Sequence, residues 1–200
     1  MEHYLACSFS KYLCKRRLIN QDYYDIYVYG TELTLSFLIT VTIIIAAGLI
    51  AGDVLSSLIF LSVFILLRRF TGGYHANTYI KCKIITVGSY LMSFFASRYL
   101  SIAWWMYILI FIFGNTIIHF LAPIENPNKP LNCDEKKKNR ALSHVVFSIL
   151  STAGLTASIL LANDISILWF SMSAVLILMI ISTIMKGGRK HEDEYCQKNS

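Results

Sequence analysis

One short stretch of the sequence, from Arg68 to Cys82, combines a histidine, a cysteine, a glycine pair and clustered positive charge. A thiol attacks as its thiolate, and a nearby imidazole is the usual base that takes the thiol proton and later returns it. His75 could serve Cys82 in this way. A single cysteine close to a single histidine also occurs in ordinary connecting loops, so spacing alone leaves both interpretations open.

The spacing restricts how the backbone can run between these two residues. On an unbroken helix, side chains seven residues apart share a face but stand about 10 Å apart along the axis. Proton transfer needs roughly 3 Å, so a straight helix from His75 to Cys82 would not allow it. The Gly72–Gly73 pair favours a bend ahead of the histidine. We therefore expect Cys82 in the first turn of the next helix, where free backbone N–H groups and the flanking Lys81 and Lys83 favour a thiolate.

The composition predicts a membrane protein. Apolar residues make up 56% and charged residues 15%, and the mean hydropathy is +0.55, whereas soluble domains carry about 25% charged residues. We expect one all-α integral membrane domain, with an interfacial N-terminal region over residues 1–31, a helical membrane core over residues 32–185 and a cytoplasmic tail over residues 186–200. No separate soluble domain and no nucleic-acid partner are expected.

Six apolar runs follow one another in pairs, which predicts three helical hairpins after the N-terminal region. The runs cover residues 33–50 and 54–67, 84–97 and 100–122, and 141–162 and 165–185. The second and third hold only about fourteen residues, and a perpendicular crossing needs about twenty. These two runs flank the His75–Cys82 stretch. They could be extended by flanking residues, thin the bilayer, or enter it without crossing.

The N-terminal region joins an apolar stripe to a basic face at helical spacing. This pattern predicts an amphipathic helix that lies in the membrane interface among the lipids, or one packed on the cytoplasmic ends of the spans. If both termini are cytoplasmic, all but Arg98 of the 18 Lys and Arg residues fall on the cytoplasmic side. We therefore expect a multi-pass protein with both termini and the His75–Cys82 stretch in the cytoplasm, and with only short turns outside.

Other polar residues lie near the ends of the spans. Glu32 starts the first span and could orient His75 or bind a substrate group, while His119 and His144 lie near the inner ends of the fourth and fifth spans. In the competing interpretation, a small membrane transporter or scaffold, these three form a polar path and Cys82 is incidental. The five cysteines form no CxxC pair and no HExxH motif exists, so neither a metal nor another cofactor is expected.

The stretch Arg68–Ala76, the cysteine at position 82 and the proline-rich segment Pro123–Pro130 together resemble the accessory gene regulator B (AgrB) family. Members of that family are integral membrane cysteine endopeptidases of bacterial quorum sensing. The resemblance covers nearly the whole chain and implies a location in the bacterial plasma membrane. By the same resemblance, Cys82 is the nucleophile and His75 its general base and then its acid, and the protein works as a homodimer.

The resemblance also implies the substrate. It would be an AgrD-like propeptide with an amphipathic helix and an acidic C-terminal part, cleaved through an acyl-thioester on Cys82 and closed into a thiolactone by a cysteine of the bound peptide. The tentative substrate-binding residues are Glu32, Arg68, Arg69, Asn77 and Lys81. Cytoplasmic topology and anionic lipid headgroups explain the positive charges as well. The sequence does not identify a third catalytic residue, for which Glu32 and Asn77 are guesses.

Overall fold

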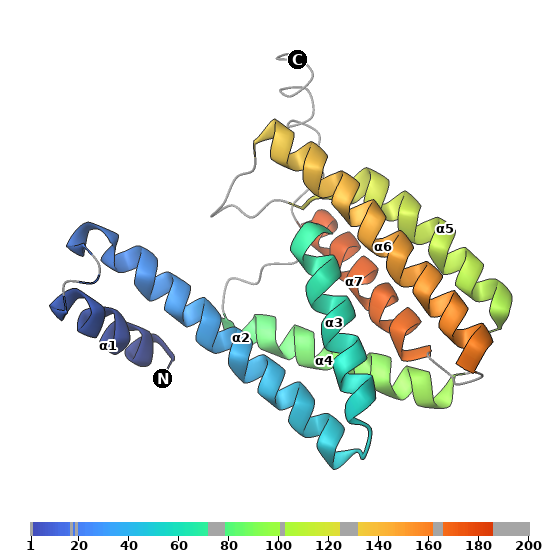
Figure 1. Cartoon of the computed structure of the whole chain (residues 1–200), viewed down its shortest axis with the longest axis horizontal. Coiled ribbons are helices and arrows are strands. Elements are labelled where there is room, and N and C mark those ends of the chain that lie inside the picture. Colours follow the sequence, from blue (N-terminus) through green and yellow to red (C-terminus); the bar gives the residue numbers. More distant parts are fainter. Residues whose placement is uncertain are drawn as a thin grey trace.

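The computed structural model describes residues 2–16, 18, 20–71, 79–100, 103–124, 132–161 and 166–185. Over these residues the chain forms seven α-helices and one short 3-10 helix (Figure 1). Their bounds are Glu2–Lys15 (α1), Gln21–Tyr23 (η1), Tyr24–Ile50 (α2), Val54–Thr71 (α3), Tyr79–Tyr99 (α4), Trp104–Leu121 (α5), Cys133–Leu161 (α6) and Ser166–Met185 (α7). The prediction of an all-α fold with six long helices after an N-terminal helical region is confirmed.

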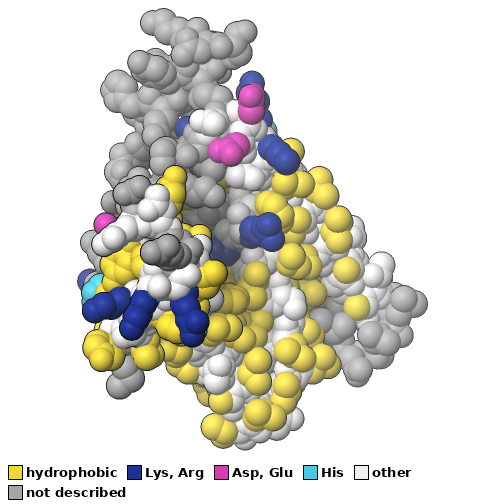
Figure 2. Space-filling view, turned by 60° about the vertical axis from the view of Figure 1, so that its left-hand side comes forward, with side chains coloured by type: hydrophobic (Ala, Val, Ile, Leu, Met, Phe, Trp, Pro, Cys, Tyr) yellow, Lys and Arg dark blue, Asp and Glu magenta, His cyan; other side chains and the backbone are white. Residues whose placement is uncertain are grey.

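Three of the described helices, α2, α3 and α7, are long and apolar enough to cross a membrane, and α5 contributes a shorter apolar stretch over Trp105–Leu121. The two runs that looked too short continue into their flanks. With 18 residues in α3 and 21 in α4, these helices measure about 27 Å and 31 Å. Hydrophobic side chains cover the lower part of the face in Figure 2, whereas Lys and Arg gather toward its left edge and upper part. A surface of this kind is expected where lipid surrounds the protein.

The core is built around α7, which contacts α3, α4, α5 and α6. Fully buried Trp169 and Met172 of α7 share this core with Phe60 of α3 and Tyr90 of α4. Tyr107 of α5 stacks on Trp169 with ring centroids 4.8 Å apart. Helices that follow each other along the chain are therefore not always packing partners: α3 and α4 contact each other little, and each contacts α7 extensively.

Helices α1 and α2 lie on one side of this bundle. In Figure 1, α1 lies alongside the first half of α2, and α2 contacts the bundle mainly through α3 and α4. Ala6 and Ser10 of α1 are fully buried, and the Tyr24 hydroxyl donates a hydrogen bond to the Cys7 carbonyl at 3.5 Å. The N-terminal helix thus packs along the start of the first long helix.

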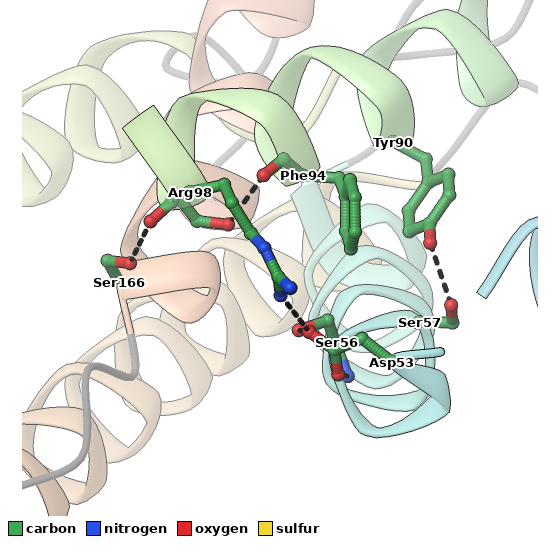
Figure 3. Close-up of polar contacts among 8 residues, drawn as sticks. Asp53, Ser56, Ser57, Tyr90, Phe94, Arg98 and Ser166 are labelled. Carbon is green, nitrogen blue, oxygen red and sulfur yellow. Dashed lines mark hydrogen bonds and ion pairs between the residues drawn. The ribbon is translucent and has the colours of Figure 1, made fainter. Parts of the chain in front are cut away.

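One polar network joins the turn after α2 to the far end of α4 (Figure 3). Asp53 caps α3, because its carboxylate accepts hydrogen bonds from the backbone N–H of Ser56 at 3.1 Å and from the Ser56 hydroxyl at 2.7 Å. Arg98 reaches the same carboxylate at 3.4 Å. Nearby, the buried hydroxyls of Ser57 and Tyr90 are 2.8 Å apart. The one arginine expected on the outer side of the membrane therefore lies beside a negative charge.

These contacts make Asp53 the more important member of the Asp53–Arg98 pair. Asp53→Ala should lower the free energy of unfolding by about 1–2 kcal/mol, because the helix cap and the ion pair are lost together. Arg98→Ala should cost about 0.5 kcal/mol, since it loses a solvent-accessible ion pair and a distant contact with the Phe94 ring but no helix cap. Unfolding of both variants in mixed detergent micelles, followed by circular dichroism, measures the difference. Equal losses would show that the cap contributes nothing.

Candidate functional site

Cys82 lies at the start of a helix, as predicted. Helix α4 begins at Tyr79, so Cys82 is its fourth residue and its side chain is partly exposed. The leading backbone N–H groups of a helix have no partner within it, and in α4 they belong to the residues directly before Cys82. Such groups carry partial positive charge and are suited to bind a developing oxyanion. His75 and Asn77 lie outside the described residues.

A positive charge lies next to the cysteine sulfur. Arg68, in the last turn of α3, donates a hydrogen bond from Nη2 to Cys82 Sγ at 3.7 Å. The same guanidinium lies over the Phe64 ring, 5.2 Å from its centroid. Hydrogen bonds from a charged donor are stronger than neutral ones, and a cationic neighbour is typical of reactive thiolates. Arg68 was expected only as a substrate-binding residue. Its contact with Cys82 could not be predicted, because no local pattern joins residues fourteen positions apart.

Two hydrogen bonds hold the residues after α5, one to the end of α3 and one to α6. The Ile124 N–H donates to the Thr71 carbonyl at 2.9 Å, and Arg140 of α6 donates from Nε to the Ala122 carbonyl at 2.8 Å. Thr71, Ala122 and Ile124 are all buried. The stretch that carries His75 leaves α3 at Thr71, and the proline-rich segment begins at Pro123. The His75 stretch and the proline-rich segment therefore begin next to the same buried, hydrogen-bonded residues. Arg140 donates one of these hydrogen bonds. From the sequence, Arg140 was expected only as one of the Lys and Arg residues on the cytoplasmic side.

The structure also describes three further residues that were predicted to bind substrate: Arg69, Lys81 and Glu32. Arg69 lies in the last turn of α3, with its guanidinium 5.8 Å from the centroid of the Phe70 ring. Lys81 is exposed in the first turn of α4. The Glu32 carboxylate contacts Nδ1 of His3 in α1, and His3 was not among the predicted site residues. The two helix ends that flank the His75 stretch in the sequence thus carry Arg68, Arg69 and Lys81. Glu32 instead contacts α1.

The polar residues of the transporter interpretation form two separate groups. Glu32 pairs with α1, while His144 of α6 lies 3.1 Å from the Asn115 side chain of α5, and its ring centroid is 5.8 Å from that of His119. Helix α2 has no extensive contact with α5 or α6. The structure therefore does not bring Glu32, His119 and His144 into one polar path. Within the described part of the chain, no group of three His, Cys, Asp or Glu residues could hold a metal ion.

The chain is similar in sequence to known proteins of one family. A family model described as Accessory gene regulator B matches residues 6–186. The AgrB-like protein 2 of Clostridium perfringens strain 13 and an AgrB-like protein of strain SM101 are each 32% identical over 121 residues, which is 57% of this chain and 56% of each relative. The chain thus spans little more than half the length of these two relatives. An AgrB-like protein of Halalkalibacterium halodurans is 25% identical over 181 residues, 84% of this chain and 87% of the relative. No solved structure matches.

Proposed function

Because the chain belongs to the accessory gene regulator B family of the agr quorum-sensing system, we propose that it is a membrane cysteine endopeptidase that processes an AgrD-like propeptide. The observation that supports this most directly is the Arg68 guanidinium at 3.7 Å from the sulfur of a helix-start cysteine. A cation and free helix N–H groups around one thiol are what an acyl-transfer nucleophile requires.

The proposed reaction has two acyl-transfer steps. In the first, His75 takes the proton of the Cys82 thiol, and the thiolate attacks the scissile carbonyl. The tetrahedral oxyanion is stabilised by N–H groups of the first turn of α4. His75 then protonates the leaving amine, the C-terminal part departs, and a thioester on Cys82 remains. In the second step, a cysteine thiol of the bound peptide attacks this thioester, displaces Cys82 and closes a thiolactone ring.

Charge supports an acidic peptide segment as the leaving part. Arg69 lies at the end of α3 and exposed Lys81 at the start of α4, so a peptide reaching Cys82 would pass close to positive charge. Asn77 is also proposed to bind the substrate, because it lies between His75 and Cys82 in the sequence. The proposal also includes multi-pass insertion in the bacterial plasma membrane, with both termini and the site in the cytoplasm. It further includes assembly as a homodimer. The segregation of Lys and Arg along the chain supports the orientation.

The test compares wild type, Cys82→Ala, His75→Ala and Cys14→Ala in liposomes containing the propeptide, with products and adducts followed by mass spectrometry. We expect cleavage and a peptidyl adduct on Cys82 in the wild type, loss of both in Cys82→Ala and His75→Ala, and full activity in Cys14→Ala. The Cys14 thiol is the matched control, because it is also free and partly exposed. Undiminished cleavage by Cys82→Ala would overturn the mechanism and move the search to other polar residues.

A further inference from the structure

Among the described residues, Cys7 lies beside a histidine. His3 and Cys7 are four residues apart on α1 and therefore share one face of that helix. His3 Nε2 lies 3.6 Å from Cys7 Sγ, and His3 Nδ1 contacts the Glu32 carboxylate of α2. Three side chains from two helices thus form a continuous thiol–imidazole–carboxylate series, which we call the Cys7 cluster. It is separate from the Arg68–Cys82 contact.

The Cys7 cluster is held in place by the packing of α1 on α2. The Glu32 side chain is only 12% exposed, whereas that of His3 is 77% exposed. The Cys7 thiol is free and partly exposed. Fully buried Ala6 and Ser10 close the contact between the two helices on either side of Cys7. The carboxylate is therefore fixed inside the contact between the helices, while the imidazole and the sulfur remain accessible to a reagent.

The order of these groups determines what they can do. A carboxylate on Nδ1 holds the proton of a neutral imidazole on that nitrogen, which leaves the Nε2 lone pair free to accept another proton. Here Nε2 faces the thiol. A nucleophile, a base and a third group that orients the base form the general arrangement of an activated nucleophile. Cys7 and Glu32 lie on opposite nitrogens of the His3 ring, so the three side chains do not converge on one point, and no group of three His, Cys, Asp or Glu among the described residues could hold a metal ion. The arrangement therefore favours nucleophilic chemistry over metal binding.

We propose that Cys7 is a second nucleophilic thiol, which accepts an acyl group from a thioester. His3 Nε2 takes the proton of the Cys7 thiol as sulfur attacks the thioester carbonyl. A new C–S bond to Cys7 forms, the old C–S bond breaks, and the leaving thiolate takes the proton from His3. One thioester replaces another, so the exchange needs neither an oxidant nor an energy source.

The surface of α1 suggests where such a donor would be. Its exposed apolar side chains and its basic residues give the helix the character of an interfacial segment. The apolar ones are Tyr4, Leu5, Phe9 and Tyr12, and the basic ones are Lys11 and Lys15, with Arg16 directly after the helix. A thioester at the membrane surface would therefore reach Cys7. Two donors share this chemistry: a long-chain acyl thioester, or a peptidyl thioester such as the one proposed on Cys82, and only the second source depends on the proposed function.

The experiment uses the full chain in anionic liposomes, with Cys82→Ala as background so that the proposed peptidase cannot contribute. One arm supplies a long-chain acyl-coenzyme A, and the other a synthetic peptidyl thioester with a small thiol leaving group. Peptide mapping by mass spectrometry gives the acylation rates of Cys7 and Cys14 in the same molecules. Cys14 is the internal control, because it lies on the same helix, is also partly exposed, and its thiol makes no hydrogen bond to a described residue.

General-base assistance contributes about 10²–10⁴-fold when geometry is ideal, so we expect Cys7 to react at least tenfold faster than Cys14 with one of the donors. The arm that responds identifies the source. His3→Gln should bring the Cys7 rate down to that of Cys14, and Glu32→Gln should lower it partly. A merely structural contact between His3 and Glu32 would change stability but not the ratio of the two rates. Equal rates at Cys7 and Cys14 with both donors would overturn the proposal, whatever the activity at Cys82.

Discussion

Replacing Arg68 by glutamine should slow acylation of Cys82 by the propeptide about tenfold to a hundredfold. The guanidinium donates to Sγ at 3.7 Å, and a hydrogen bond to a charged group contributes about 1.5–3 kcal/mol. Without it, the thiolate loses its charged partner while the helix-start N–H groups remain. Single-turnover measurement of the peptidyl adduct on Cys82 gives the rate. Arg68→Lys should recover part of it, because lysine restores the charge without the planar fork of donors.

Two controls separate a role at the sulfur from a role in peptide docking. Alkylation of Cys82 by iodoacetamide needs no peptide, so it should slow in Arg68→Gln if the guanidinium acts on the sulfur. If Arg68 only docked the acidic part of the substrate, alkylation would be unchanged and only the apparent affinity for the propeptide would fall. Arg98→Gln is the matched variant, because Arg98 pairs with Asp53 at the other end of α4. Its acylation rate should equal that of the wild type.

Gly114→Ala should destabilise the protein by about 1–3 kcal/mol, the usual cost of overpacking a filled core. A Cβ atom at Gly114 of α5 would lie 2.2 Å from Cζ of Phe147 in α6, and the Phe147 ring is fully buried. The ring or the α5–α6 contact must therefore shift. The midpoint of thermal unfolding in detergent micelles measures the loss.

Gly88→Ala in α4 is the matched control, because no heavy atom lies within 4 Å of a Cβ built there. Alanine replaces glycine in a helix interior with a gain of about 0.5–1 kcal/mol, so this variant should unfold at a higher temperature than the wild type. If both variants shifted in the same direction by the same amount, helix propensity rather than the contact with Phe147 would explain the result.

Much of the fold could be predicted because its signals are local. The length of each apolar run and the polar breaks between runs predicted the helices, and the Gly72–Gly73 pair followed by lysines predicted a helix start near Cys82. The same reasoning fails at contacts between distant segments. Arg98 is the one basic residue expected on the outer side of the membrane, and nothing local in the sequence indicated that Asp53 is its partner. The sequence order suggested hairpins, yet α7 packs mainly on α3, α4 and α5 and only weakly on its chain neighbour α6.

The sequence by itself determined which parts of this protein are helices, that it belongs in a membrane, and that Cys82 lies near the start of a helix. Those properties depend on hydrophobicity and turn residues that are read within a few positions. Only the tertiary structure decided the partners: Arg68 at the Cys82 sulfur, Glu32 at His3 across 29 positions, and Phe147 over Gly114. Such pairs form because side-chain shape and burial select which helix faces meet, and no periodicity within one helix carries that information.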